Sequence, residues 1–260
     1  MMAIDVKNLT KKFDKFVAVD DISFQVEKGS IFAFLGPNGA GKSTVIKMMT
    51  TILSPTDGSI FINNYDIHNE KSEVRKSIGV IFQDHTLDDE LTAYENLYYH
   101  SALYKIPEKI RHEKIDDMLH YVGLLDRKND LVKTFSGGMK RRIEIARGLL
   151  HSPTILFLDE PTLGLDVQTR AFLWNYIKKI NEEHGITIFF TTHNMEEVEN
   201  IATKIAIIDK GRILIQGTSK EIKKATKTKT LENAFLTLTG YDIREQPADS
   251  ANHMKRRFMR

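Results

Sequence analysis

The chain has 260 residues, a formal net charge of +2 and no cysteine. Its 41% hydrophobic and 28% charged residues are those of an ordinary globular protein, and one large α/β domain can reach this length. The small net charge does not favour nucleic-acid binding, and the lack of cysteine excludes disulfides and thiolate metal sites. No apolar run approaches the ~20 residues of a membrane-spanning helix, and the N-terminus shows no apolar signal-peptide segment.

Short apolar runs bounded by polar residues or glycine predict buried strands at residues 31–35, 78–82, 154–158, 187–191 and 205–209. Helical patterns lie between several of these runs, notably at residues 42–51 and 169–183. Strands that alternate with helices predict a mostly parallel core sheet covered on both faces.

Two regions depart from this alternation. Residues 22–26 and 59–63 alternate in polarity and predict a small antiparallel sheet beside the main one. Residues 91–151 contain several helical stretches and no strand pattern, which indicates an α-helical insertion. We therefore expect one domain over residues 1–219. Residues 220–260, with 10 Lys/Arg against 5 Asp/Glu, are expected to form a basic extension: a short helix and a disordered tail.

The most specific motif follows the first predicted buried strand and fits the phosphate-loop pattern GxxxxGK[ST]. Its glycines allow a tight turn in which successive N–H groups converge on a phosphate, at a helix N-terminus that adds partial positive charge. Lys42 is expected to reach the β- and γ-phosphates, and the Ser43 hydroxyl to bind Mg²⁺. The nucleotide-binding residues of the motif are Gly36, Pro37, Asn38, Gly39, Ala40, Gly41, Lys42, Ser43 and Thr44.

Two carboxylates end the predicted strand at residues 154–158. Asp159 at the strand tip can hold a metal through water, and Glu160 is placed to polarise the attacking water. Acidic residues also end many strands without any catalytic role. The phosphate loop in the same chain favours the catalytic interpretation.

Residues 134–142, Thr-Phe-Ser-Gly-Gly-Met-Lys-Arg-Arg, resemble the LSGGQ signature of the ATP-binding cassette (ABC) ATPases. Phe135 and Met139 stand where that family usually has Leu and Gln, but the Ser-Gly-Gly core is intact. In the family this core opens a helix and clamps the γ-phosphate held by the other subunit. In this chain the matching residues, which the resemblance implies bind nucleotide, are Ser136, Gly137 and Gly138.

Four further residues match the same family in the expected order. The resemblance implies that Gln83 contacts Mg²⁺ and relays the nucleotide state to a membrane domain, and that His193 contacts the γ-phosphate. It also implies that Asp166 lies in the loop that crosses the dimer interface, and that Phe13 stacks on adenine. Each residue alone has a plainer interpretation, as a surface glutamine, a structural histidine or a locally packed aromatic ring.

The resemblance covers residues 4–217 and implies an ABC-type P-loop ATPase with an α/β fold. It implies ATP and Mg²⁺ as cofactors, a second cassette (a copy or a close paralogue) and a transmembrane permease subunit as partners, and no nucleic acid. The chain would then sit at the cytoplasmic face of the cell membrane. Lys42, Glu160 and His193 would be catalytic, and the metal ligands would be Ser43, Gln83 and Asp159. The signature variant, together with residues 230–240, looks most like the daunorubicin-resistance type of export ATPase.

One alternative of another class stays open, a soluble ABC ATPase of the iron–sulfur assembly type. A plain P-loop kinase or GTPase has no reason to carry the signature motif. The repeat of Tyr94, Tyr98 and Tyr99 after Gln83 allows two interpretations. These rings either pack inside the helical insertion or line a cleft where a helix of the membrane chain docks.

Overall fold

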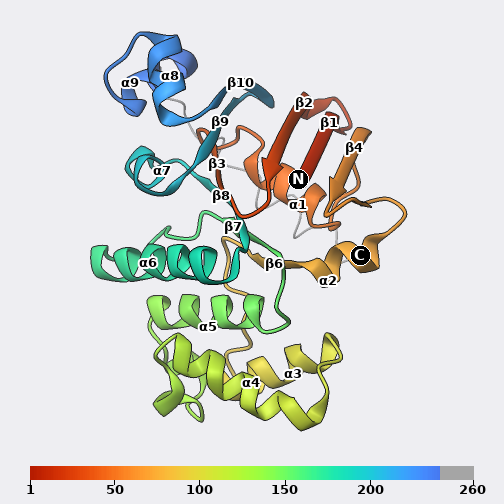
Figure 1. The fold of residues 1–260 in the computed structure, drawn as a ribbon, viewed down its shortest axis with the longest axis vertical. Helices are drawn as coiled ribbons and strands as arrows, with labels where there is room; N and C mark the ends of the chain where they lie inside the picture. The colour runs from red at the N-terminus through yellow and green to blue at the C-terminus, as the bar shows by residue number, and fades with distance from the viewer. Residues whose placement is uncertain (241–260) are drawn as a thin grey trace.

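Two sheets and a layer of helices build residues 1–240, the part of the chain that this computed structural model describes (Figure 1). The predicted disordered tail, residues 241–260, lies outside the described residues. The strands are β1 (Met2–Phe13), β2 (Phe16–Glu27), β3 (Ile31–Leu35), β4 (Asp57–Ile62), β5 (Tyr65–Asp66), β6 (Ile78–Ile81), β7 (Ile155–Asp159), β8 (Thr187–Thr192), β9 (Lys204–Asp209) and β10 (Arg212–Gly217). The helices are α1 (Lys42–Met49), α2 (Lys71–Ser77), α3 (Ala93–Leu103), α4 (Glu108–Tyr121), α5 (Gly137–Leu149), α6 (Val167–His184), α7 (Met195–Ile201), α8 (Ser219–Thr226) and α9 (Leu231–Thr239), with 3₁₀ turns η1 (Leu125–Arg127) and η2 (Val132–Thr134).

The larger sheet has the strand order β10-β9-β3-β8-β7-β6, and all neighbours except β10 and β9 run parallel. Every residue of β3, β7 and β8 is buried, as expected for apolar strands covered on both faces. The predicted mostly parallel sheet is confirmed. The antiparallel edge strand β10 was not predicted, because its exposed and partly buried residues alternate and do not form a continuous apolar run.

The smaller sheet is antiparallel, with the order β2-β1-β4-β5. It is larger than the sequence patterns at residues 22–26 and 59–63 indicated, because β1 and β2 form a hairpin of 12-residue strands. Phe24 of this sheet meets Phe32 and Phe189 of the larger sheet, with ring centroids 5.7 and 6.0 Å apart. These stacked rings join the two sheets through a common core.

The predicted helical insertion consists of α3, α4 and α5, which form the lower layer in Figure 1. Thr92 begins α3 with a capping box, since its side chain accepts from the Glu95 N–H while the Glu95 carboxylate accepts from the Thr92 N–H. Ser136 caps α5 in a similar way, by accepting from the Met139 N–H. Two polar residues in the sequence thus fix where two helices of the layer begin.

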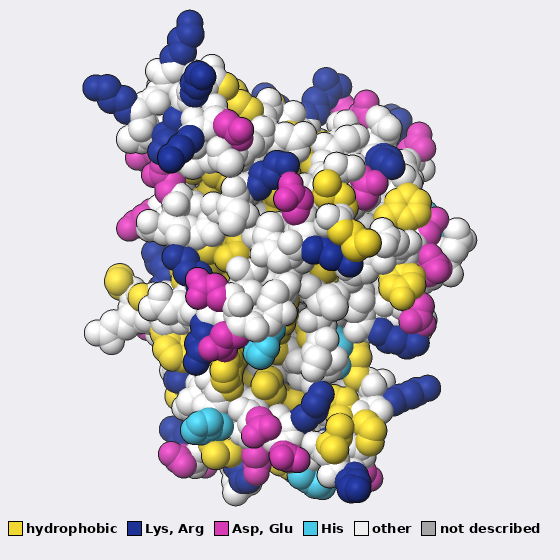
Figure 2. All heavy atoms as spheres, in the orientation of Figure 1, with side chains coloured by type: hydrophobic (Ala, Val, Ile, Leu, Met, Phe, Trp, Pro, Cys, Tyr) yellow, Lys and Arg dark blue, Asp and Glu magenta, His cyan; other side chains and the backbone are white. Residues whose placement is uncertain are grey.

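Two helices, rather than the single short helix expected, follow β10. Thr218 caps α8, and Thr230 caps α9. Ile222, Leu231 and Ala234 are fully buried and belong to the same apolar core as the larger sheet. Lysine side chains gather over α8 and α9 on the face that Figure 2 shows, which gives this region its basic charge. The domain boundary after residue 219 stays a prediction.

Between residues 1 and 240, no helix is long and apolar enough to cross a lipid bilayer.

Candidate active site

The sheet topology brings three predicted segments to one edge. Strands β3, β7 and β8 are parallel neighbours, so the residues that follow them emerge side by side. These followers are the phosphate loop, the pair Asp159–Glu160 and His193. Open parallel sheets usually bind ligands at the carboxyl ends of their strands.

The phosphate loop is held close to the backbone of two other strands. Gly41 has a φ of 106°, and a Cβ there would come within 2.6 Å of the Ala18 carbonyl oxygen. A Cβ on Gly36 would come within 2.4 Å of the Ile208 carbonyl oxygen. Glycine is therefore required at both positions, by backbone conformation at one and by lack of space at the other.

Lys42, the first residue of α1, lies beneath this loop and is 5% exposed. Its Nζ donates to the carbonyl oxygens of Gly36 at 2.9 Å and Pro37 at 3.2 Å. The same ammonium forms an ion pair with Glu160 Oε1 at 3.0 Å. The two carbonyl oxygens and the Glu160 carboxylate together offset the cost of burying this cation beside the phosphate loop.

Asp159 at the tip of β7 accepts two hydroxyl hydrogen bonds on Oδ1. Ser43 Oγ donates to it at 3.1 Å, and Thr191 Oγ1 donates at 2.6 Å. The Ser43 hydroxyl and the Asp159 carboxylate are hard oxygen donors beside the phosphate loop. This donor set suits Mg²⁺, which takes few protein ligands and completes its shell with phosphate and water.

Glu160 adopts a strained backbone conformation for a non-glycine residue, with a φ of 47°. Its N–H donates to the carbonyl and hydroxyl oxygens of Thr191, at 3.2 and 3.0 Å. The carboxylate is thereby aimed between two partners, Lys42 on one side and His193 Nδ1 at 2.9 Å on the other. Strain at a candidate general base, held by a neighbouring strand, is a common feature of active sites.

A cavity of about 500 Å³ joins most of the predicted nucleotide-binding residues. It is lined by residues 38–44 of the phosphate loop and by Gln83, Glu160 and His193. Phe13 does not line it. That ring is 43% exposed, beneath the Lys11 ammonium, and pairs across the β1–β2 hairpin with Phe16. Phe16 lines the cavity instead and was not predicted, although it is the next aromatic residue on the same hairpin.

Ser136, Gly137, Gly138 and Asp166 lie outside this cavity. Ser136 and Asp166 cap α5 and α6 and are exposed. A hydrogen bond from the Thr169 N–H, with a second from its hydroxyl, holds the pKa of the Asp166 carboxyl below its usual range. The two caps are neighbours, since a Cβ on Gly138 would come within 2.7 Å of the Thr169 side chain. The chain does not bring its own signature residues to its own phosphate loop.

Arg141 is a further residue of the site that the sequence did not reveal. It is buried on α5 and donates to the carbonyl oxygens of Phe82 at 2.6 Å and Pro161 at 2.9 Å. It also pairs with the Glu144 carboxylate, which accepts from the Thr86 N–H at 2.9 Å. Arg141 therefore ties the segment around Gln83 to the segment after Glu160. Its position beside the signature motif was the available signal.

Comparisons with known proteins point to one family. The family model described as ABC transporter matches residues 19–163. The linearmycin resistance ATP-binding protein LnrL of Bacillus subtilis (strain 168) is 40% identical, over 84% of this chain and 70% of the relative. The daunorubicin/doxorubicin resistance ATP-binding protein DrrA of Streptomyces peucetius is 37% identical, over 88% and 69%. A methionine import ATP-binding protein of Bacillus thuringiensis subsp. konkukian (strain 97-27) is 38% identical, over 83% and 65%.

Among solved structures, the dimeric post-hydrolysis state of the cassette MJ0796, bound to ADP and Pi, superposes with a TM-score of 0.75. It is 28% identical and covers 83% of this chain and 98% of its own. The family model spans more than half of the 260 residues, and the phosphate loop, Asp159 and Glu160 all lie within the match. This chain therefore belongs to the ABC transporter family and is one of its ATP-binding, ATP-hydrolysing subunits.

Proposed function

We propose that this cassette works as one of a pair and powers export through a separate permease subunit, at the cytoplasmic face of the membrane. The observation that carries the proposal is the split of the site residues. Lys42, Glu160 and His193 share one cavity, whereas residues 136–138 are outside it on the same chain. A site that uses both sets needs a second cassette to supply the missing one.

In the proposed reaction, the phosphate-loop N–H groups and Lys42 bind the β- and γ-phosphates of ATP. Ser43 and Gln83 would hold Mg²⁺ directly, and Asp159 would hold it through water. The metal would supply positive charge against the charge that develops on the phosphates. Engagement of Lys42 by phosphate loosens its pair with Glu160, whose carboxylate then accepts a proton from the attacking water. His193, beside Glu160, donates to the γ-phosphate.

Closure of the pair follows from differential binding. ATP held by one phosphate loop also meets the exposed N-terminus of α5 in the partner, where Ser136 and the helix dipole favour an anion. After hydrolysis the bridging phosphate is gone and the partner loses this contact. The closed state is therefore stabilised by ATP and not by ADP, which gives the permease two states to follow.

A groove on the cassette, beside the segment that follows Gln83, is a candidate docking site for the membrane chain. This groove, which we call the docking groove, has a volume of about 360 Å³ and lies between the larger sheet and α3. Its lining includes Ile52, Phe82, Thr86, His100, Tyr104 and Arg147. Ile52 is 60% exposed there, although isoleucine usually avoids water. A short helix of the permease seated here would touch Thr86, only three residues from Gln83.

The tyrosines expected to line such a groove do not line it. Tyr94 and Tyr98 stack on one another and pack against α4, where the Tyr94 hydroxyl binds His112. Tyr99 is 56% exposed and outside the groove. The interpretation of Tyr94 and Tyr98 as packed within the insertion therefore has the stronger support, and Tyr104 takes the place in the groove.

The two relatives named for drug resistance support export. A relative named for methionine import has similar identity, so the direction of transport has to be tested. The soluble iron–sulfur alternative is not favoured. The tagged chain, purified from native membranes, should bring down a multi-span membrane protein identifiable by mass spectrometry. Inside-out vesicles that contain both chains should then accumulate substrate when ATP is added outside. Purification of the cassette with soluble proteins alone would contradict the proposal.

A further inference from the structure

Glu197 on α7 is a buried carboxylate that the proposed reaction does not use; it is 5% exposed. Its two oxygens serve two different segments. Oε1 accepts from the Thr162 hydroxyl at 2.6 Å, and Oε2 accepts from the Thr192 hydroxyl at 3.2 Å. Arg170 Nε lies 3.7 Å from Oε1 and provides the nearest opposite charge.

The two threonines flank the two groups that would act on the water and the γ-phosphate. Thr162 follows Glu160 by two residues, and Thr192 immediately precedes His193. The Thr192 hydroxyl also accepts from the Asn194 N–H at 3.0 Å, so the backbone is tied on both sides of His193. Glu197 thus joins the segment after β7 to the segment after β8.

The contact between His193 Nδ1 and Glu160 Oε2 at 2.9 Å completes a closed ring of interactions. The ring runs from Glu160 along the chain to Thr162, through Glu197 to Thr192, and along the chain to His193. A movement of either segment would therefore stretch a hydrogen bond on the far side of the ring.

Only a carboxylate can fill the position of Glu197 in this ring. An ionised carboxylate accepts hydrogen bonds on both oxygens, and such charge-assisted bonds are stronger than neutral ones. Glutamine has the same shape but presents an amide NH₂ on one side. One of the two threonine hydroxyls would then lose its acceptor inside the protein, which is unfavourable.

We propose that Glu197 is a positioning residue for ATP hydrolysis, which fixes the His193 imidazole against the Glu160 carboxylate by holding Thr192 and Thr162 together. The inference rests on the roles proposed above for Glu160 and His193. In this inference α7 holds the segment after β7 and the segment after β8 in fixed positions relative to each other. No contact between Glu197 and the nucleotide is required.

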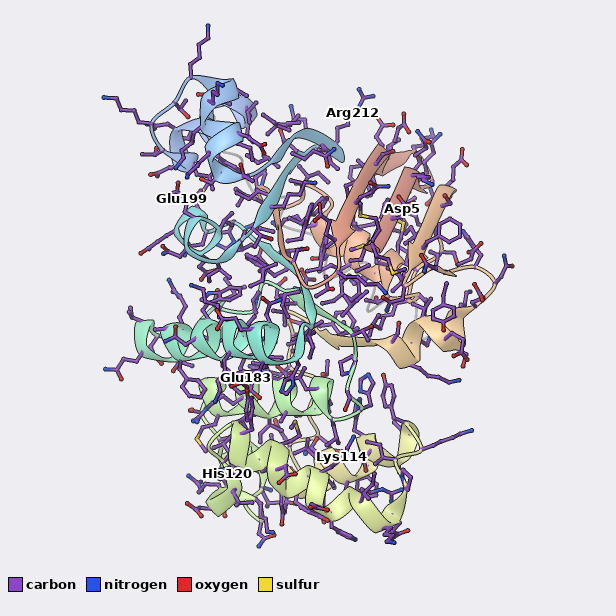
Figure 3. The ribbon with its side chains drawn as sticks, viewed as in Figure 1. Asp5, Lys114, His120, Glu183, Glu199 and Arg212 are labelled. Atoms are coloured by element: carbon purple, nitrogen blue, oxygen red, sulfur yellow. The ribbon has the colours of Figure 1, made fainter. Side chains whose placement is uncertain are left out.

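The test is Glu197→Gln in the full chain, measured by kcat, KM for ATP and thermal unfolding. We expect kcat to fall about tenfold, because small misplacements of reacting groups are costly, with KM and ATP affinity within about twofold of wild type. Glu199→Gln is the matched control on the same helix. Glu199 lies between α7 and α8 (Figure 3), where it accepts from Lys223 at 2.8 Å and Ser219 at 3.2 Å. This control should keep the wild-type kcat.

Thr192→Val and Thr192→Ser give a second comparison that does not depend on how well Glu197→Gln folds. Valine removes the hydroxyl that Glu197 accepts from and should lower kcat about tenfold, whereas serine keeps the hydroxyl and should retain most of the activity. Equal losses in the two variants would overturn the inference. A fall of ATP affinity and unfolding temperature in step with kcat would also overturn it, because that pattern describes a purely structural residue.

A double-mutant cycle with His193→Ala separates this inference from the proposed function. If Glu197 acts through His193, then Glu197→Gln should change kcat less than twofold in the His193→Ala background. A full tenfold loss in both backgrounds would show that Glu197 acts elsewhere. If His193→Ala alone leaves kcat unchanged, the proposed role of His193 fails, and the positioning role fails with it.

Discussion

The Lys42–Glu160 pair joins two side chains that the proposed reaction would separate. Both are buried, their charged atoms are 3.0 Å apart, and both side chains line the cavity. In the proposed reaction, a phosphate that reaches Lys42 would bring a stronger negative charge and repel the Glu160 carboxylate toward His193. If Glu160 is the general base, it is held before the reaction by the residue proposed to bind the phosphates, and substrate binding would release it.

Glu160→Gln should separate binding from hydrolysis. Glutamine keeps the shape but accepts no proton at neutral pH and makes no ion pair with Lys42, so ATP affinity should stay equal or rise. We expect the rate of hydrolysis to fall by about 100-fold or more. Size-exclusion chromatography with ATP should show a stable dimer. Hydrolysis at the wild-type rate, or no dimer with ATP, would exclude Glu160 as the base. Glu182→Gln, at an exposed position of α6, is the control.

Phe16 and Phe13 are the two candidates for the ring that stacks on adenine. If the ring that lines the cavity stacks on the base, Phe16→Ala should lower ATP affinity by about 1 kcal/mol, with little change for Phe13→Ala. The family resemblance predicts the reverse. Titration of each variant with a fluorescent ATP analogue distinguishes stacking by Phe16 from stacking by Phe13. Equal affinities for both variants and wild type would show that neither ring stacks on adenine.

At the scale of helices and strands, most of what could be predicted came from patterns within continuous stretches of sequence. The phosphate loop, the strand that ends in Asp159 and the helical insertion were all readable because each depends on a continuous stretch of sequence. Arg141 and Glu197 could not be predicted, because their partners are distant in the sequence and only the fold brings them together. Arg141 donates to the carbonyl oxygens of Phe82 and Pro161, and Glu197 accepts from the Thr162 hydroxyl. Phe16 was missed because two aromatic residues on one hairpin look alike until the cavity is seen.

The N-terminus of α5 should matter to the pair and not to the single cassette. A Cβ on Gly137 would meet nothing within 4 Å, so Gly137→Ala should fold normally. Alanine there, and Ser136→Arg more strongly, would intrude where the partner's γ-phosphate is expected. We expect ATP binding by the monomer to be nearly normal, while the ATP-dependent dimer of a Glu160→Gln background is lost. A large loss of monomer affinity would contradict a shared site.

Helix α3 should make the protein sensitive to acid through His100. Burial, with the nearby charges of Arg147 and His151, lowers the pKa of His100 to about 4. Below the usual pKa of histidine the unfolded chain binds a proton that the folded chain refuses, so stability should fall as the pH drops from 7 toward 4. The loss at pH 5 is about 2 kcal/mol for this residue. Urea unfolding at pH 7.5 and 5.0 should show a smaller difference for His100→Gln than for wild type.

At the scale of the whole molecule, one short segment contributes to the lining of both the nucleotide cavity and the docking groove. Gln83 lines the cavity, and Thr86 lines the groove. Arg147 donates to the Thr86 carbonyl oxygen at 2.8 Å, and Glu144 holds the Thr86 N–H. Both bonds come from α5, the helix that Ser136 begins. Nucleotide at Gln83, a partner nucleotide at Ser136 and a permease helix in the groove would thus all act on the same few residues.

This arrangement predicts that the docking groove can be disabled without harm to the cassette. Ile52 is the residue of choice, because its side chain is 60% exposed in the groove and contributes little to the core. Ile52→Asp places a charge where an apolar helix face is expected, and desolvating that charge opposes docking. We expect normal unfolding temperature and normal ATPase activity of the isolated cassette, with loss of the membrane chain on co-purification.

Ile110→Asp, an isoleucine 40% exposed on α4 and outside the groove, is the matched control and should retain the partner. Tyr104→Ala tests another part of the groove lining, where the ring centroids of Tyr104 and His151 are 3.8 Å apart. It should weaken the partner while the cassette still hydrolyses ATP. Tyr99→Ala should not weaken the partner, because Tyr99 does not line the groove. If Ile52→Asp retains the partner while Ile110→Asp or Tyr99→Ala releases it, the permease docks on the outer face of the helical insertion and not in the groove.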